Sequence, residues 1–580
     1  MRKYGKIVKK YWWCFILAPF FMILEACGEF ILPYINANVI DIGAANKDVG
    51  FILQNGLWMA LISIAMLITG VLGAFFAIRG ASYFARDIRR KVFNKIQKFS
   101  FANIDDFTTG SLITRITNDI TQIQGFTQTL LRGVFRSPVM LIGALIMSFS
   151  LNPRLACVIF AVVPLLALAI FLIIKTASPR YTEMQHRLDL LNSNIGETIT
   201  NERVIKSFVR EEYEKEKFGG VNSNLMEKSI SALKVMMLLQ PVSAFAVNAT
   251  TLAVVWFAGK QITVGDMTLG TLTAFITYLT QILNGLNMMA NIILQFSRAA
   301  ASDRRISEVL NAEIDLTDDF AAHKDKKTER GDIEFKNVYF RYFKDNSENV
   351  LENISLKIRG GELVGIIGST GSGKSTLVSL IPRLYDADSG EVTVDGVNVR
   401  DYSLYNLRES VAVVLQNNTL FSGTIKENLR WGNEDASDEE IVKAAQTAQA
   451  DEFVSRFENG YDTELEQGGK NLSGGQKQRL CIARALLKKP KILILDDSTS
   501  AVDTKTEAKI REAFRTELAG VTKIIIAQRI TSVIDADKIV VLDDGKIAGF
   551  GTHSELISTC EEYREIYYSQ KEKEADGNGR

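Results

Sequence analysis

The sequence has little cysteine, little histidine and no net charge. Five cysteines are scattered over 580 residues without a C-x-x-C pair, so neither a disulfide framework nor a zinc site is expected. Lysine and arginine together number 67, as do aspartate and glutamate. Because the charges cancel, the chain is not expected to bind nucleic acid through a global basic field. Hydrophobic residues make up 47% of the sequence, which argues against wholesale disorder.

Long apolar runs are present, and they lie almost entirely before residue 300. A helix of roughly 20 residues crosses a bilayer core of about 30 Å. Six runs reach that length, at residues 14–38, 56–79, 131–151, 155–175, 235–259 and 269–297. One such run could be a buried helix of a soluble protein, but six in succession predict a membrane domain. We place this six-helix domain in residues 1–312.

Lysine and arginine residues predict the orientation of that domain. They cluster in the first ten residues and in the two long connections that follow the second and fourth runs, whereas the other three connections are poor in positive charge. The positive-inside rule therefore places both termini and both long connections in the cytoplasm of a multi-pass plasma-membrane protein. The long connections have a mostly helical pattern. Their far turns, near residues 100–110 and 198–208, are natural places for contact with a cytoplasmic domain.

The character of the sequence changes after residue 312. Residues 313–331 are polar and charged and are predicted as a linker. Residues 332–570 alternate short β-rich runs with helical segments, which predicts an α/β domain with a largely parallel sheet. The predicted strands are 333–340, 363–367, 411–415, 492–495, 524–527 and 538–542. Residues 571–580 are predicted as a disordered tail.

A glycine-rich segment at residues 368–375, with the sequence GSTGSGKS, follows the predicted strand 363–367. It fits the P-loop pattern G-x-x-x-x-G-K-[ST] in the expected strand–loop–helix context. The glycines let backbone N–H groups surround phosphates, Lys374 should reach the β- and γ-phosphates, and the Ser375 hydroxyl should ligate magnesium. The sequence therefore predicts a site for ATP and Mg²⁺. The residues expected to form it are Gly368, Ser369, Thr370, Gly371, Ser372, Gly373, Lys374, Ser375 and Thr376.

Two acids end a second apolar strand. Asp496 and Asp497 follow the predicted strand 492–495. Asp496 is predicted to bind magnesium directly or through water. A second acid at this place normally polarises the attacking water, and in this chain that position is held by Asp497.

Between the P-loop and these acids lies the run LSGGQKQR, at residues 472–479. This run and its spacing resemble the signature motif of the ABC transporter ATPases. Further matches in family order are Tyr342 at the adenine-stacking position, Gln416 in the glutamine loop and residues 500–503 in the D-loop. The resemblance covers nearly the whole chain. It implies a six-helix transmembrane bundle with long cytoplasmic helical extensions, followed by an α/β P-loop NTPase domain with an ABC helical subdomain.

The resemblance also implies how the site residues would act. Two such ATPase domains would close head to tail on two ATP molecules, each held between one chain's P-loop and the other chain's signature. Gln416 would join Ser375 and Asp496 at the metal and take part in catalysis. In the signature, Ser473 and Gly475 would donate hydrogen bonds to the partner's γ-phosphate, and Gly474 and Gln476 would also belong to the nucleotide site.

Two catalytic positions depart from the family pattern. The family has glutamate where this chain has Asp497 and histidine where it has Gln528. The chain's own histidines match neither position; they are His186, His323 and His553. Aspartate is one methylene shorter, which withdraws its carboxylate by roughly 1–1.5 Å, and a misplacement of about 1 Å can cost on the order of 100-fold in rate. Gln528 can hydrogen-bond a phosphate but cannot become cationic. ATP binding should therefore survive while hydrolysis at this chain's own P-loop should be slow.

The signature, by contrast, is complete. It would be of full use only opposite a P-loop with intact glutamate and histidine. The chain thus resembles the degenerate-site subunit of heterodimeric bacterial multidrug ABC exporters, with a second half-transporter as its partner and small hydrophobic or amphipathic compounds as substrates. Harmless drift in an active homodimer is one alternative. A lipid flippase, a peptide exporter and a mainly regulatory ATP-binding subunit are the others.

Polar residues in two of the predicted spans are candidates for the substrate path. Glu25 and Glu29 share one helix face, where they could attract cationic amphiphiles or pair with Arg132 or Arg136. A stripe of amides shares one face of the sixth span and consists of Gln281, Asn284, Asn287, Asn291 and Gln295. These amides could line the path or form hydrogen bonds between helices.

Overall fold

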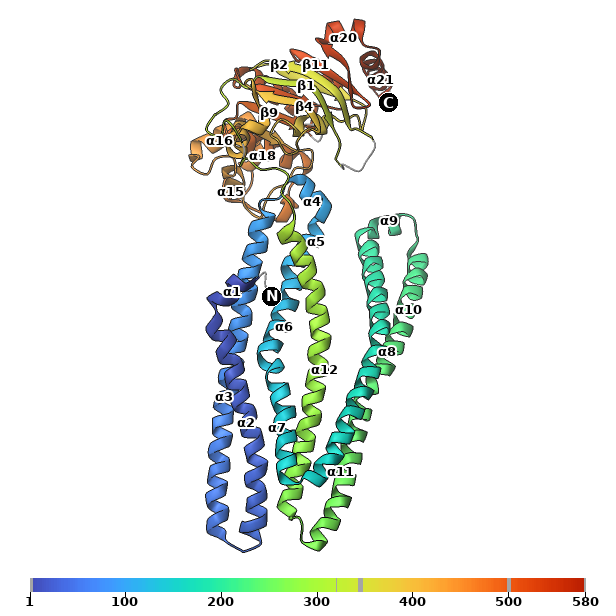
Figure 1. The fold of residues 1–580 in the computed structure, drawn as a ribbon. Helices are drawn as coiled ribbons and strands as arrows, with labels where there is room; N and C mark the ends of the chain where they lie inside the picture. The colour runs from blue at the N-terminus through green and yellow to red at the C-terminus, as the bar shows by residue number, and fades with distance from the viewer. Residues whose placement is uncertain (1–3, 320, 343–347, 498–501, 578–580) are drawn as a thin grey trace. The chain divides into compact units, whose positions relative to one another are not determined.

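The structure is a computed structural model that describes residues 4–319, 321–342, 348–497 and 502–577. The chain divides into two compact units. The first contains the described residues up to 97 together with residues 110–312, and the second contains residues 98–109 and the described residues from 313 onward (Figure 1). A short segment near residue 100 therefore belongs to the second unit.

The first unit is built of helices, three of which continue into π-helical turns. α3 and α8 contain 48 residues each, which at 1.5 Å per residue is about 72 Å, more than twice a bilayer core of about 30 Å. The helices are α1 (Gly5–Lys10), α2 (Trp12–Asn38), α3 (Val49–Ile96), α5 (Thr109–Thr114), α6 (Ile120–Thr129), α7 (Arg136–Leu151), α8 (Pro153–Thr200), α9 (Glu202–Ser207), α10 (Glu211–Met237), α11 (Leu239–Val264) and α12 (Leu269–Asn311). The π-helical turns are η2 (Val39–Ala44), η3 (Arg115–Asp119) and η4 (Leu130–Val134).

Five helical segments of the described chain are long and apolar enough to cross a membrane. They are Trp12–Ala44, Val49–Ile96, Thr109–Leu151, Pro153–Thr200 and Glu211–Val264. They contain the first five of the six predicted spans. The sixth predicted span, 269–297, lies in α12, which is not among these segments. Its stripe of amide side chains lowers its mean hydropathy, so the count of six spans stays a prediction.

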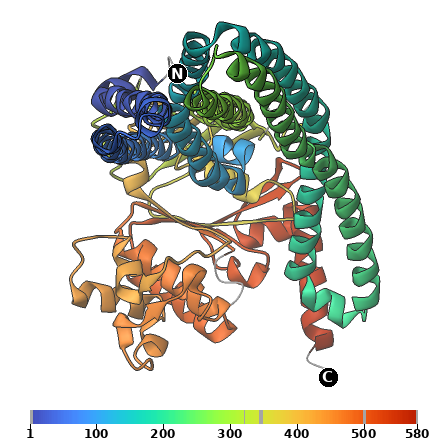
Figure 2. The ribbon, with the colours of Figure 1, turned by 90° about the horizontal axis from the view of Figure 1, so that it is seen from below.

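The long helices of this unit lie in two groups. α2 packs along α3, and α12 packs against α2, α6 and α7. α8 packs against α10 and α11. Figure 2 shows α2 and α3 (blue) at one side of the unit and the α8–α10 pair (teal and green) at the other.

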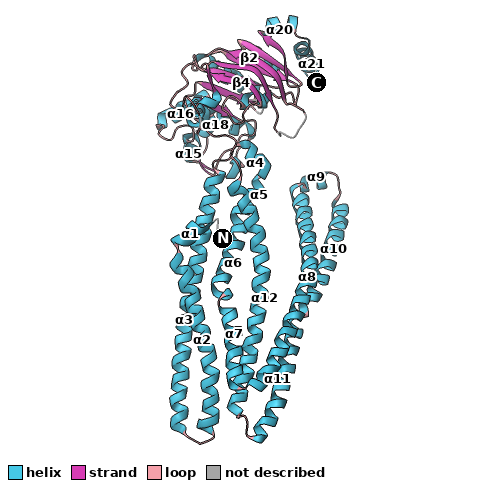
Figure 3. Cartoon of the chain, in the orientation of Figure 1, coloured by secondary structure: helices cyan, strands magenta, loops and turns pink. Residues whose placement is uncertain are grey.

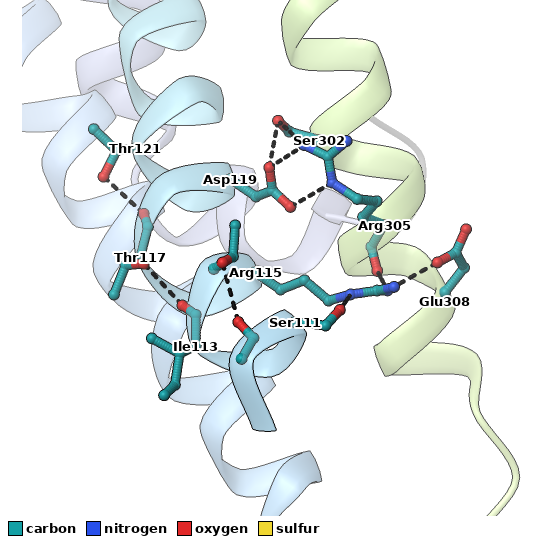
Figure 4. Close-up of polar contacts among 11 residues, drawn as sticks. Ser111, Ile113, Arg115, Thr117, Asp119, Thr121, Ser302, Arg305 and Glu308 are labelled. Atoms are coloured by element: carbon teal, nitrogen blue, oxygen red, sulfur yellow. Dashed lines mark hydrogen bonds and ion pairs between the residues drawn. The ribbon is translucent and has the colours of Figure 1, made fainter. Parts of the chain in front are cut away.

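A polar cluster joins the π-helical turn η3 to α12 (Figure 4). Asp119 is 2% exposed, and it accepts hydrogen bonds from Oγ of Ser302 at 2.9 Å and from Nε of Arg305 at 2.8 Å. In the same cluster, Arg115 donates from Nη1 to Oε2 of Glu308 at 2.8 Å, and Glu308 is half exposed. Two ion pairs therefore connect the same two segments, one with a buried carboxylate and one with a half-exposed carboxylate, and fix their register.

Strands lie only in the second unit, within the described part of the chain (Figure 3). The main sheet has the strand order β12-β11-β3-β10-β9-β6, and neighbouring strands are parallel except at β12, which pairs antiparallel with β11. A second sheet has the order β2-β1-β4-β5 and is antiparallel, while β7 and β8 form a separate pair. The strands are β1 (Ile333–Phe340), β2 (Leu351–Ile358), β3 (Leu363–Gly368), β4 (Ser389–Val394), β5 (Val397–Asn398), β6 (Val411–Val414), β7 (Gly423–Thr424), β8 (Glu464–Leu465), β9 (Ile492–Asp496), β10 (Thr522–Ile526), β11 (Lys538–Asp543) and β12 (Lys546–Gly551).

The six predicted strands correspond to β1, β3, β6, β9, β10 and β11, with ends within two residues. The largely parallel sheet is confirmed for five of these strands. The exception is β1, which lies in the antiparallel sheet, and the other strands of that sheet were not predicted. β5, β7 and β8 are two residues long, too short to give a periodic signal.

The register of the main sheet brings three strand ends together. Asp496 at the end of β9 pairs with Ile526 of β10, and Ile526 pairs with Ile366 of β3. The segments that follow these three strands therefore start at one edge of the sheet. The crevice beyond the carboxyl ends of parallel strands is where ligands bind in open α/β sheets.

Helices cover the sheets of the second unit, and α18 packs against α15 and α16. They are α4 (Phe101–Phe107), α13 (Lys374–Ser379), α14 (Leu404–Ser410), α15 (Ile425–Arg430), α16 (Asp438–Thr447), α17 (Asp451–Val454), α18 (Gly474–Leu487), α19 (Thr504–Thr516), α20 (His553–Thr559) and α21 (Glu561–Gly577). α21 runs through residues 571–577 of the predicted tail, and residues 578–580 lie outside the described residues.

The helix α4 lies against Tyr385 in the second unit. The hydroxyl of Tyr385 donates a hydrogen bond to Oδ2 of Asp105 at 2.9 Å. The ring centroids of Tyr385 and Phe101 lie 6.0 Å apart. The side chain of Asn103 donates to the carbonyl oxygen of Glu313 at 3.1 Å. Residues 98–109, which include most of the turn at 100–110 that was predicted to contact a cytoplasmic domain, thus belong to the second unit.

Candidate functional site

A cavity of about 560 Å³ lies at the edge of the main sheet where β3, β9 and β10 end. Small-molecule sites typically measure roughly 300–1,000 Å³. The predicted site residues that line it are Tyr342, Gly368, Ser369, Thr370, Gly371, Gly373, Lys374, Ser375, Thr376, Gln416, Asp496, Asp497 and Gln528. Ser372 is not among the lining residues, since its side chain is buried beneath the loop.

The P-loop connects β3 to α13 through two glycines that need left-handed backbone. Gly371 and Gly373 have φ of 89° and 91°, a region that glycine enters without steric cost. Lys374 begins α13 and donates from Nζ to the carbonyl oxygens of Gly368 at 3.0 Å and Ser369 at 2.6 Å. Burial lowers the pKa of Lys374, and Asp496 and Asp497 oppose that shift. A desolvated lysine at this place is a strong partner for phosphate.

Ser375 and Asp496 supply the oxygens expected at a magnesium site. Oγ of Ser375 donates to Oδ1 of Asp496 at 3.0 Å. Burial raises the pKa of the Asp496 carboxyl, and the hydrogen bond from Ser375 and the charge of Lys374 oppose the rise. Mg²⁺ prefers hard oxygen ligands and is usually bound through one or two carboxylates and substrate phosphates while it keeps several waters. The donor set therefore fits a magnesium ion held together with ATP.

Asp497 and Gln528, the two positions that depart from the family pattern, contact each other in this cavity. Gln528 donates from Nε2 to Oδ2 of Asp497 at 2.9 Å. Asp497 has a positive φ of 46°, and its N–H donates to the carbonyl oxygen of Ile526 at 3.0 Å. Burial raises the pKa of the Asp497 carboxyl, as does the charge of Asp496, and a hydrogen bond with Gln416 opposes the rise. Gln416 thus lies beside the acid, while its role as a metal ligand remains a prediction.

Tyr342 lies at the rim of the cavity. Its hydroxyl forms a hydrogen bond with Oγ1 of Thr376 at 2.8 Å. Its ring makes edge contacts with the rings of Phe340 and Tyr385, with centroid distances of 5.1 and 5.2 Å. The side chain is 39% exposed. A ring held by edge contacts keeps a face available for stacking, which fits the predicted role with adenine.

The signature residues lie at the N-terminus of α18 and do not line this cavity. Ser473 caps the helix by accepting at Oγ from the N–H of Gln476, at 3.3 Å, and Gln476 accepts from the N–H of Ser473 at 2.8 Å. Ser473 and Gly474 are exposed, and Gly475 is half-buried. The start of α18 therefore presents backbone N–H groups with the positive end of a helix dipole.

Some site residues were not predicted, and part of one prediction falls outside the described chain. Val350, Ile526, Ile566 and Gln570 also line the cavity. Ile566 and Gln570 come from α21, which carries no recognised motif. In the predicted D-loop, Ser500 and Ala501 lie outside the described residues.

The two acids of the first span are paired with Arg136. Nη2 of Arg136 lies 3.5 Å from Oε1 of Glu25 and contacts Oε1 of Glu29 more closely. Side-chain exposures of these three residues lie between 19 and 22%. Of the two proposed partners, Arg136 is thus the one found, and two carboxylates share one guanidinium. Oε2 of Glu25 and Oε2 of Glu29 are buried without a hydrogen-bond partner in the described structure.

The amide stripe on α12 is divided between the two roles considered for it. Gln281 donates to the carbonyl oxygen of Glu29 at 2.8 Å, Asn287 accepts from Ser243 at 3.5 Å, and Gln295 accepts from Thr129 at 2.7 Å. These three bonds join α12 to α2, α11 and α6. Asn284, Asn291 and Gln295 are exposed, so these three side chains fit the lining of a path, and Gln295 takes part in both arrangements.

Comparison with known proteins also indicates an ATP site. A family model described as ABC transporter transmembrane region matches residues 15–286, and one described as ABC transporter matches residues 351–500. The chain is 40% identical over 570 residues to the uncharacterized ABC transporter ATP-binding protein YfiB of Bacillus subtilis (strain 168), covering 98% of each chain. It is 34% identical over 576 residues to the putative multidrug export ATP-binding/permease protein YgaD of the same organism, covering 98% of this chain and 99% of YgaD.

Among solved structures, a bacterial Atm1-family ABC exporter with ATP bound matches with a TM-score of 0.82 and 25% identity. The match covers 97% of this chain and 98% of that chain. The two family models follow the same order along the chain as the helical unit and the unit that carries the P-loop. The chain therefore belongs to the ABC transporter family, as an ATP-hydrolysing exporter half in which a membrane domain is fused to an ATPase domain that uses ATP and Mg²⁺.

Proposed function

We propose that this chain is the degenerate-site subunit of a heterodimeric ABC exporter. The observation that carries the proposal is the hydrogen bond from Gln528 to Asp497. The two departures from the family pattern are in contact, so they act on one chemical step. A carboxylate that is short by one methylene and already hydrogen-bonded to two amides is poorly placed to orient water. An amide in the histidine position cannot supply a positive charge to the γ-phosphate.

The groups expected to hold ATP line the same cavity, which supports the proposal that nucleotide binding does not share this weakness. Lys374, Ser375 and Asp496 lie together in one cavity, and Tyr342 stands at its rim. Ser375 and Asp496 would hold a magnesium ion, which when bound would supply positive charge to the phosphates of ATP. Lys374 would add a second positive charge beside them. The chain would then keep ATP bound through many cycles of its partner.

Two exposed surfaces support the need for a second chain. The start of α18 is open at Ser473 and Gly474, and a signature acts on the ATP of the opposite subunit. In the first unit, the end of α9 exposes a cluster of apolar side chains, with Phe208 at 72% and Val209 at 80%. Exposed apolar side chains at a tight turn fit a docking contact. We propose that both surfaces meet a second half-transporter that has the glutamate and histidine lacking here.

The proposed substrates are hydrophobic or amphipathic compounds of the multidrug type. Support comes from the similarity to YgaD and from Glu25 and Glu29, whose two carboxylates share the single charge of Arg136. An excess of negative charge within the span would favour cationic amphiphiles. The orientation proposed from the positive residues places both termini in the cytoplasm. Lipid flipping and peptide export are the nearest alternatives.

The experiment that tests the asymmetry uses the co-expressed pair in proteoliposomes. Asp496→Asn in this chain should leave dye transport largely intact, whereas the equivalent change in the partner should abolish it. Equal losses from the two changes would contradict the proposal. If transport survives Asp496→Asn but stops responding to ATP concentration, the chain acts mainly as a regulatory subunit.

A further inference from the structure

Gln570, on the C-terminal helix α21, holds the backbone of the segment that carries Gln528. Its side-chain amide donates from Nε2 to the carbonyl oxygen of Gln528 at 2.7 Å and accepts at Oε1 from the N–H of Ile530 at 2.8 Å. Both the donor and the acceptor of the amide are therefore used. Because the two bonds reach residues 528 and 530, they fix the orientation of the backbone between these residues. A single bond would leave that backbone free to rotate.

The helix that carries Gln570 is anchored in the ATPase unit. Tyr563 is fully buried, and its hydroxyl forms a hydrogen bond with Nδ1 of His553 at 2.8 Å. Ile566 and Tyr567 pack against the core under the main sheet. Ile566 and Gln570 both line the cavity that holds the P-loop. This part of α21 is thus a wall of the ATP site.

The far end of the same segment is held by a different helix. From α19, Arg515 donates to the carbonyl oxygen of Asp535 at 2.6 Å, and Glu507 accepts from Oγ of Ser532 at 2.6 Å. Arg511 of α19 also donates to the carbonyl oxygen of Thr531, so the contacts of α19 reach residues 531–535, whereas the side chain of Gln570 contacts residues 528 and 530. Gln570 therefore holds the part of the segment that lies beside the cavity.

We propose that Gln570 is a positioning residue of the ATP site. By fixing the backbone at residues 528–530, it sets the direction of the Gln528 side chain and keeps its Nε2 at hydrogen-bond distance from Asp497. A shift of about 1 Å at a reacting group can cost on the order of 100-fold in rate, so a small movement of this segment matters. All the atoms involved belong to one chain. The role therefore does not depend on whether the partner is a second copy or a different subunit.

Hydrogen exchange of the full-length chain in nanodiscs tests the contact directly. Gln570→Met keeps the side-chain length and removes both hydrogen bonds. Ser569→Met places the same side chain at an exposed neighbour and is the matched control. We expect faster exchange at Ile530 in Gln570→Met, with exchange in α19 unchanged, and no change at Ile530 in Ser569→Met. Unchanged exchange at Ile530 in Gln570→Met would overturn the proposal.

Steady-state kinetics separate a positioning role from a merely structural one. In the background Asp497→Glu with Gln528→His, Gln570→Met should lower kcat on the order of tenfold while KM for ATP stays within about twofold. Gln570→Glu keeps an acceptor for Ile530 but loses the donor to residue 528, so it should lower kcat without speeding exchange at Ile530. A parallel loss in kcat and ATP affinity would overturn the proposal. If the background itself gains no turnover, the proposed degenerate site fails, and the exchange result still decides the role of Gln570.

Discussion

Gln528 and Asp497 form a hydrogen-bonded pair, with Nε2 of Gln528 2.9 Å from Oδ2 of Asp497, inside the cavity that contains the P-loop. The pair lies at the carboxyl ends of β10 and β9, which are neighbours in the main sheet. Lys374, Ser375 and Asp496 surround the same cavity. We propose that this site combines the expected nucleotide-binding groups with an altered pair at the catalytic step.

Restoring the family residues at this pair should raise hydrolysis. Asp497→Glu lengthens the carboxylate by one methylene, and Gln528→His introduces a group that can become cationic. We expect the double variant to hydrolyse ATP on the order of 10- to 100-fold faster than the unchanged chain, and each single variant to gain less. Phosphate release by the purified chain measures the change. Adding Lys374→Ala to the double variant should remove the gain, and a gain that survives Lys374→Ala would mean that the phosphate comes from another enzyme.

The magnesium-dependent part of ATP binding should weaken as pH falls. Burial raises the pKa of Asp496 above that of an ordinary aspartate, which is about 3.9. Mg²⁺ requires the carboxylate, so its contribution to affinity is present above the raised pKa and is lost as pH falls through it. Ser375→Ala removes a hydrogen bond that opposes the rise, so the loss should move to higher pH and the contribution should shrink.

Calorimetric titration of ATP with and without Mg²⁺ over a pH series measures this dependence. Asp496→Asn is the control, because it should make the magnesium contribution small at every pH. A Ser375→Ala curve displaced to lower pH would contradict the assignment of this pair.

The two ion pairs between η3 and α12 should differ in their contribution to stability. Arg305→Ala leaves the carboxylate of Asp119 buried with Ser302 as its remaining donor in Figure 4. Removing one partner of a buried pair costs several kcal/mol, and we expect about 2 kcal/mol because Arg305 itself is 47% exposed. Glu308→Gln, which changes the half-exposed carboxylate paired with Arg115, should cost less than about 1 kcal/mol. Thermal unfolding of the purified chain in detergent compares them, and a larger effect from Glu308→Gln would contradict the assigned burial.

Substitutions of Glu25 and Glu29 should have different effects, because Arg136 contacts Glu29 more closely than Glu25. Glu29→Gln should mainly lower stability, by about 1–3 kcal/mol, since it removes the closer of the two carboxylates that share a mostly buried guanidinium. Glu25→Ala should alter efflux of cationic dyes more than basal ATP hydrolysis. ATP-driven dye uptake into inverted vesicles, which corresponds to efflux from the cell, and phosphate release by the same vesicles give the two values, with an uncharged dye as the control. Equal changes in both would show that Glu25 is structural.

Much of the ATP site could be predicted from the sequence because its signals are local. The P-loop needs glycines at residues 371 and 373, where φ is positive, and a lysine and a serine at the start of the next helix. The strand ahead of Asp496 is a continuous apolar run, as a strand buried on both faces of a parallel sheet must be. These features depend on residues within a few positions of each other.

The rest depends on residues that only the fold brings together. Gln570 lies 42 positions after Gln528, at the last residue of the predicted ATPase domain and in a helix that carries no recognised motif. The choice of Arg136 as the partner of Glu29 depends on how α7 packs on α2. Likewise β1 has the composition of any half-buried strand, and its place in the antiparallel sheet follows from its partners β2 and β4. Pairing over such distances has no signature in a single segment.

The measurement that tests the central claim most directly is ATP turnover by the purified chain alone, compared with its Lys374→Ala variant, together with ATP binding by both. The degenerate site predicts that the unchanged chain binds MgATP and turns it over barely faster than Lys374→Ala, which should lose binding. Robust turnover by the chain alone that disappears in Lys374→Ala would contradict the account and show an active homodimer.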